Sequence, residues 1–357
     1  MRLFGYFQNQ FQQAGAPNAA RERNSFALQQ LNVFVQKDLA RNWTALVNLE
    51  VLNTFSTSRQ TGAMNLKEAW VRYRHGRGLN IRAGLQIPIF NHLNAIKDQT
   101  PVLPYVTRPL VYEESLEEVA SLEEFIPDRA FLQVFGTLQP AKPLKVDYAF
   151  FIGNSPNIAD LDDDGQSGVD TTNTLLFGAR LGLRIQDLKA GVSITHDRSN
   201  RFRRVARVLE VPVDALTELP RIRVGVDVRY TVGPLTFEGE YIYVHYHERD
   251  HLLEINKEFY YGTLRWLIRD RLTLYGSFWV TREQNNIPPP PQAPQPPDGV
   301  FSFVLRNDAP SVGAAFNLSD RIVLKGQYAR LERSNNTRFV ARERSFNIYS
   351  VAVSVFF

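Results

Sequence analysis

The chain has 357 residues, of which 44% are hydrophobic and 12% aromatic, with a net charge of +4 and no cysteine. The lack of cysteine excludes disulfides and thiolate metal sites, and 41 basic against 37 acidic residues favour local charge pairing over a nucleic-acid-binding surface. No stretch of about 18 apolar residues occurs, so we expect no transmembrane helix.

Stretches of alternating apolar and polar residues recur along the whole chain. In the third stretch, for example, Trp43, Val47 and Val51 alternate with Asn48 and Glu50. Successive side chains of a strand point to opposite faces, so each stretch predicts a strand with one apolar face. The predicted strands are 3–11, 27–36, 43–53, 66–73, 79–89, 129–138, 144–153, 174–185, 188–195, 221–230, 235–244, 259–267, 272–281, 311–318, 322–331 and 345–357.

The connections between these strands alternate between tight and long. The tight ones carry Gly, Pro, Asn or Asp at turn positions, and they are 38–42, 74–78, 139–143, 186–187, 231–234, 269–271 and 319–321. The long ones are 12–26, 54–65, 90–128, 154–173, 196–220, 245–258, 282–310 and 332–344. In a soluble β-sandwich no structural constraint makes short and long loops alternate in this way. The pattern predicts an all-β, single-domain protein over residues 1–357, a transmembrane antiparallel up-and-down barrel of sixteen strands.

The last stretch, SFNIYSVAVSVFF (345–357), has an apolar face that includes Tyr349, Val351 and Phe357, opposite small polar residues. A strand with this dyad pattern suits lipid on one side and water on the other. This last strand, with phenylalanine as its final residue, resembles the terminal signature of Gram-negative outer-membrane barrel proteins. The resemblance implies a location in the bacterial outer membrane and contact with its lipids.

Residues 90–128 form the longest insertion, and they are the third of the long connections. Here the chain resembles the Gram-negative porins, whose third loop folds into the lumen and narrows the pore. The segment PVLPYVTRPLVYEE (101–114) is similar to part of the phosphate-selective porins. The resemblance implies a constriction loop at 90–128 and a homotrimer.

The end of this loop is acidic, and strand parity places cations on the facing wall. An acidic loop opposite a basic wall would create a transverse field that orients polar solutes. The alternatives are a hydrated loop on the outer rim and wall charges that merely pair with their neighbours. The constriction residues we predict are Arg72, Arg82, Arg129, Arg180, Arg223 and Arg265 on the wall, with Glu113, Glu114, Glu117 and Glu118 in the loop.

One long connection contains carboxylates at alternate positions before a glycine. Asp160, Asp162, Asp164 and Asp170 fit the start of a calcium-binding loop, although Thr171 stands where a bidentate glutamate is expected. The alternative is an acidic loop that only faces water. Apart from this calcium site we expect no cofactor.

These features predict a porin, a passive diffusion channel for small hydrophilic solutes and ions with a weak preference for anions, phosphate among them. The alternative is a structural barrel that anchors partner proteins through its loops, which a lumen filled with bulky apolar side chains would favour. No GxSxG motif occurs, and we expect no enzymatic activity and no nucleic-acid partner.

Overall fold

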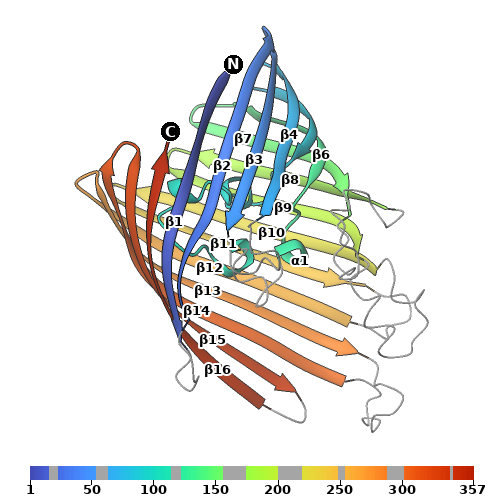
Figure 1. Cartoon of the computed structure of the whole chain (residues 1–357). Coiled ribbons are helices and arrows are strands. Elements are labelled where there is room, and N and C mark those ends of the chain that lie inside the picture. Colours follow the sequence, from blue (N-terminus) through green and yellow to red (C-terminus); the bar gives the residue numbers. More distant parts are fainter. Residues whose placement is uncertain are drawn as a thin grey trace.

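The computed structural model describes residues 1–15, 23–53, 63–113, 122–155, 174–199, 219–247, 254–287, 301–337 and 341–357. Within these ranges sixteen strands form a closed barrel, in which every strand pairs with its neighbours in sequence and β1 pairs with β16 (Figure 1). All pairings are antiparallel. The architecture and the strand number predicted from the sequence are confirmed.

The strands are β1 Arg2–Gly15, β2 Arg23–Ala40, β3 Trp43–Asn53, β4 Ala63–His75, β5 Leu79–Gln86, β6 Ala130–Leu138, β7 Leu144–Asn154, β8 Leu175–Ile185, β9 Leu188–Ser199, β10 Leu219–Val232, β11 Leu235–Tyr246, β12 Glu254–Ile268, β13 Leu272–Ile287, β14 Phe301–Ser319, β15 Ile322–Thr337 and β16 Ala341–Phe356. Between β5 and β6 lie three short 3₁₀ helices, η1 Asn94–Ile96, η2 Thr100–Val102 and η3 Leu110–Tyr112, and one α-helical turn, α1 Leu122–Phe125. No helix in the described ranges is long and apolar enough to cross a bilayer.

The barrel closes where the two ends of the chain meet. Gly5 and Phe357 exchange two backbone hydrogen bonds of 3.0 Å, and farther along the pair Phe11 lies opposite Val351. A Cβ atom at Gly5 would lie 2.4 Å from the carbonyl oxygen of Asn32 and 2.7 Å from the ring of Phe357. Only glycine therefore allows β1 to approach both neighbours at this point. Both termini lie at the barrel end that carries the tight turns (Figure 1).

The alternation read from the sequence corresponds to the two faces of the wall. On β10, Ile222 and Val226 are exposed on the outside, whereas Arg223 and Asp227 are buried on the inside. On β16, Val351 is 56% exposed and Ser354 is fully buried. The outer face is thus apolar and the inner face polar, as a barrel surrounded by lipid requires.

Several strands end elsewhere than the sequence predicted. β13 reaches Ile287 and β14 begins at Phe301, so strands take up much of the expected connection 282–310. Polar residues such as Asn286 and Ser302 pair there, because a strand pair that extends beyond the membrane is wet on both faces and needs no apolar alternation. β5 stops at Gln86 rather than at residue 89, after a register shift between Ala83 and Gln86 at which Gly84 has a φ of 114°.

Candidate functional site

The chain between β5 and β6 lies against inward-facing side chains of the barrel. We call its described parts, residues 87–113 and 122–129, the inner segment. Two carboxylates on β11 hold it. The Tyr105 hydroxyl donates to Glu238 at 2.6 Å, and the Tyr112 hydroxyl donates to Glu240 at 2.5 Å. The backbone N–H of Leu93 donates to the same Glu240 carboxylate at 2.6 Å.

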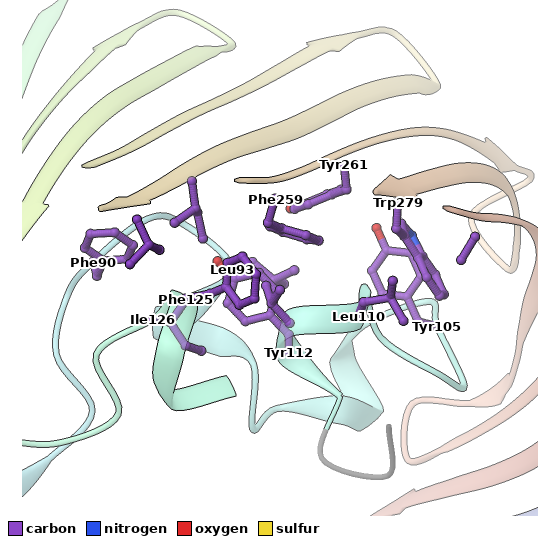
Figure 2. Packing of buried hydrophobic residues seen from close by; sticks show 14 of the residues in the cluster. Phe90, Leu93, Tyr105, Leu110, Tyr112, Phe125, Ile126, Phe259, Tyr261 and Trp279 are labelled. Atoms are coloured by element: carbon purple, nitrogen blue, oxygen red, sulfur yellow. The ribbon is translucent and has the colours of Figure 1, made fainter. Parts of the chain in front are cut away.

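Apolar packing accompanies these hydrogen bonds. Figure 2 shows Leu93, Tyr112 and Phe125 of the inner segment gathered against Phe259 and Tyr261 of β12. The ring centroids of Tyr112 and Phe259 are 6.0 Å apart in an edge-on arrangement. All of these side chains are almost completely buried, so the sector of the lumen beside β11–β13 is filled.

The inner segment is also attached to β1, β2 and β15. Gln327 on β15 accepts hydrogen bonds of 2.8 Å from the backbone N–H groups of Val106 and Thr107. Lys325, the next inward-facing residue, donates to the Thr100 carbonyl at 2.7 Å and to Gln8 of β1 at 2.9 Å. The segment is therefore attached to β11, β15, β1 and β2.

Charges inside the inner segment largely compensate one another. Lys97 donates to Asp128 at 2.8 Å, and this ammonium together with Lys67 outweighs the effect of burial and lowers the pKa of Asp128. The Arg108 guanidinium lies 3.3 Å from Glu113 and 3.8 Å from Asp98 and donates to the Lys97 carbonyl at 2.7 Å. The segment is thus a compact unit with internal ion pairs rather than an acidic surface.

The predicted acidic array is described only in part. Glu113 is buried beside Arg108, and Glu124, farther along the same acidic stretch, forms an ion pair with Lys257 of β12. Neither carboxylate is paired with the wall arginines that the transverse-field hypothesis placed opposite them. Glu114, Glu117 and Glu118 lie outside the described residues, so their part of the hypothesis stays a prediction.

Three of the predicted wall arginines point inward and form ion pairs with carboxylates on other strands. Arg180 contacts Asp227 at 2.8 Å, Arg223 contacts Asp197 at 3.1 Å and Arg265 contacts Glu238 at 2.8 Å. Arg223 also donates to the Glu124 carbonyl at 3.0 Å, which ties β10 to the inner segment. Pairing of this kind is the alternative that the sequence left open, and it applies to these three residues.

The other three predicted arginines have different surroundings. The Arg82 guanidinium lies 4.3 Å from the ring centroid of Trp70 and 5.1 Å from that of Phe135, and Arg72 lies 5.8 Å from Trp70. Within the described residues neither arginine has a carboxylate within 4.0 Å, although Glu68 attracts Arg82 and Asp38 attracts Arg72 from farther away. The aromatic faces are their nearest favourable contacts. Arg129 is about half exposed and lies 3.5 Å from Asp128.

A cavity of about 330 Å³ lies between the inner segment and the inner faces of β6–β10. Its lining includes Asn91 and His92 of the inner segment, together with the carboxylates Asp147 and Asp227. The cations that line it are Arg77, Arg180, Arg184, Lys189 and Arg229. Burial lowers the pKa of His92, so this imidazole is neutral at pH 7.

Sequence reasoning missed several members of this cavity. Strand parity could have found Lys189, which is two residues before Gly191 and four before the inward-facing Ser193. Nothing in the sequence marks Asn91 or His92, because their position depends on how the inner segment folds back. The calcium ligands proposed at Asp160, Asp162, Asp164 and Asp170 lie outside the described residues and remain a prediction. Within the described residues no cluster of metal-ligating side chains occurs.

No protein-family model and no curated protein sequence matches this chain. Solved structures match it over its full length. An anion-selective porin from Comamonas acidovorans is 12% identical with a TM-score of 0.62, covering 100% of this chain and 99% of that one. The outer membrane channel DcaP of Acinetobacter baumannii is 11% identical with a TM-score of 0.61, covering 100% and 96%. OmpT of Vibrio cholerae, in a trimer form, is 11% identical with a TM-score of 0.56, covering 100% and 99%.

At these identities the likeness shows the fold. The chain has the architecture of the bacterial outer-membrane barrels, and its apolar outer face fits that location. Within that class it is a general porin-like barrel of sixteen strands.

Proposed function

We propose that this protein is a passive diffusion channel of the bacterial outer membrane for small hydrophilic solutes, with a preference for anions. One observation carries the proposal: the wall of β6–β10 borders a polar cavity whose lining holds five cations and two carboxylates. Closed barrels with a polar lumen conduct small solutes, and the sign of the lining charge selects ions. The fold shared with an anion-selective porin and an outer membrane channel supports the same function.

Two wall arginines strengthen the anion preference. Arg72 and Arg82 lie directly opposite each other on β4 and β5, and both stack on Trp70. Charges without a carboxylate in direct contact contribute more field to the lumen than the pairs Arg180–Asp227 and Arg265–Glu238 do. Phosphate is therefore a suitable test solute beside chloride.

The test is the conductance of single channels in planar bilayers, with the reversal potential measured in a potassium chloride gradient. The wild type should conduct and its reversal potential should have the sign of chloride preference. Replacing both Arg72 and Arg82 with serine should move the reversal potential towards cations. Arg321→Gln, in the exposed turn between β14 and β15, is the control for loss of a charge. A folded protein that does not conduct, or one that prefers potassium, would contradict the proposal.

A second function is favoured by the filled sector beside β11–β13. Bulky rings there, among them Phe259 and Trp279, pack against the inner segment and reduce the open lumen. A structural barrel that anchors partners through its loops would have a lumen of this kind. If the protein is folded but does not conduct in the bilayer experiment, the anchoring function is favoured over transport.

We also propose a homotrimer, by analogy with the OmpT trimer form. Sedimentation of the detergent-solubilised protein tests this directly, and a mass equal to one chain after correction for detergent would contradict it.

A further inference from the structure

We propose that the cavity beside β6–β10 is a saturable binding site for a small multivalent anion, of the phosphate or dicarboxylate class. The inference rests on the proposed channel function only in that the anion must reach the lumen. It goes beyond a general anion preference, because it assigns one site and the residues that form it.

The first argument is a row of like charges across four neighbouring strands. Lys145 of β7 lies directly opposite Arg184 of β8, Arg184 lies opposite Lys189 of β9, and Lys189 lies opposite Arg229 of β10. We call these residues the cationic row. Like charges directly opposite each other on a sheet repel and destabilise it. Three such pairs in succession are unfavourable by themselves. Three members of the row, Arg184, Lys189 and Arg229, line the cavity, and an anion bound there would offset their repulsion.

The second argument is the charge balance of the cavity. Arg184 forms an ion pair with Asp147, and Arg180 forms one with Asp227. Within the described residues, Arg77, Lys189 and Arg229 have no carboxylate within 4.0 Å, and Asp147 and Glu238, which attract Lys189 and Arg229 from farther away, are already paired with Arg184 and Arg265. The cavity lining thus holds five cations and two carboxylates, an excess of positive charge. A multivalent anion matches that excess better than chloride does, because its interaction energy with each cation scales with its charge.

The inner segment supplies the third argument. The side chain of Asn91 is fully buried at the cavity wall, and neither its oxygen nor its nitrogen has a hydrogen-bond partner in the described structure. Buried amides without partners are rare, and they often mark a site for an absent ligand or water. The Arg229 guanidinium also approaches His92 to 3.5 Å, which positions it at the same wall.

Size and access fit a small solute. A volume of about 330 Å³ lies at the lower end of the range of about 300–1,000 Å³ typical of ligand pockets. Arg77 lies in the turn before β5, and Lys189 follows the turn between β8 and β9, so the mouth of the cavity faces the end of the barrel with tight turns. The site faces the lumen, which excludes lipid headgroups of the surrounding membrane and leaves soluble anions as the ligand.

The binding test uses the full chain, refolded in a zwitterionic detergent, and isothermal titration calorimetry with inorganic phosphate and, separately, succinate. The wild type should bind at least one of them at a single saturable site. In the double variant Lys189→Gln with Arg229→Gln, the dissociation constant should increase at least tenfold. The control Arg321→Gln removes a charge from a turn outside the cavity and should bind as the wild type does. Wild type that binds neither anion, or a double variant with unchanged affinity, would overturn the proposal.

Thermal unfolding provides a second measurement that does not depend on conduction. Phosphate should raise the Tm of the wild type, because a ligand that binds only the folded state stabilises it. The double variant relieves the repulsion in the cationic row, so it should fold at least as well without phosphate, and its Tm should no longer respond to phosphate. A protein that binds an anion but does not conduct would refute the channel function and leave the binding site supported. A protein that conducts but binds neither anion would refute the binding site and leave the channel function supported.

Discussion

The Tyr112 hydroxyl donates a hydrogen bond of 2.5 Å to Glu240, a buried carboxylate on the inner face of β11. Two residues earlier on the same strand, Glu238 accepts the hydroxyl of Tyr105 at 2.6 Å. Two tyrosines of the inner segment are thus attached to one strand through neighbouring inward-facing carboxylates. This arrangement fixes which sector of the lumen the segment fills.

Removing both hydroxyls should loosen the inner segment. A hydrogen bond to a charged group is worth about 1.5–3 kcal/mol, and the carboxylates would remain buried with fewer partners. The chain has no cysteine, so Val102→Cys, at a position 63% exposed in the segment, provides a single site for a spin label. In the Tyr105→Phe and Tyr112→Phe double variant the label should become more mobile. Tyr260→Phe, on the outer face, should leave its mobility unchanged, and equal mobility in all three proteins would refute this anchoring role.

The same two tyrosines predict a response to alkaline pH. Burial, and then the charge of Glu240, raise the pKa of Tyr112 well above its ordinary value of 10.0, and burial and Glu238 do the same for Tyr105. Their contribution to attachment is therefore complete below pH 10 and is lost as the pH rises through the raised pKa values. Absorbance of tyrosinate near 295 nm should show this. The absorbance change of the wild type minus that of the double Phe variant isolates Tyr105 and Tyr112, and it should show no transition near pH 10. A transition of two groups near pH 10 would contradict the raised pKa values.

A charged side chain on the outer face of β16 should destabilise the barrel. Val351 and Val353 are exposed on the lipid-facing side, and arginine on that face costs about 2–4 kcal/mol near the membrane midplane. Arginine at either position should therefore lower the free energy of unfolding in lipid vesicles by that amount. Asn42→Arg, in the exposed turn between β2 and β3, should cost little. Equal stability of the three variants would mean that this strand faces the lumen.

Asp197 should be the most sensitive of the paired wall carboxylates. It accepts hydrogen bonds from Arg221 at 2.8 Å and Arg223 at 3.1 Å, and all three side chains are fully buried. Asp197→Asn leaves two buried guanidinium groups with less compensation, and breaking a buried pair costs about 3–5 kcal/mol. The matched control is Asp308→Asn, which breaks the partly exposed pair with Arg306 and should cost about 0–1 kcal/mol. Denaturant unfolding measures both, and equal losses would contradict the burial argument.

The charges of the inner segment explain where the sequence prediction of the site fell short. Strand parity placed Arg180, Arg223 and Arg265 on the inner wall, and the structure has them there. Their partners could not be found in advance, because Arg223 and Asp197 come together only through the register of β9 and β10. Glu113 was expected to face the arginine wall, but it lies beside Arg108 of its own segment.

The sequence by itself determined the barrel, its sixteen strands, and which face of strands such as β10 and β16 meets lipid. Each of these follows from local information, since side-chain alternation and loop length depend only on neighbours along the chain. Only the tertiary structure decided where the inner segment lies and which lumen charges stay unpaired. The contact between Tyr112 and Glu240 joins residues 128 positions apart, and the cationic row needs the register of four strands. Such contacts form only in the closed barrel, because closure brings residues that are far apart in the sequence within reach of hydrogen bonds and charge pairing.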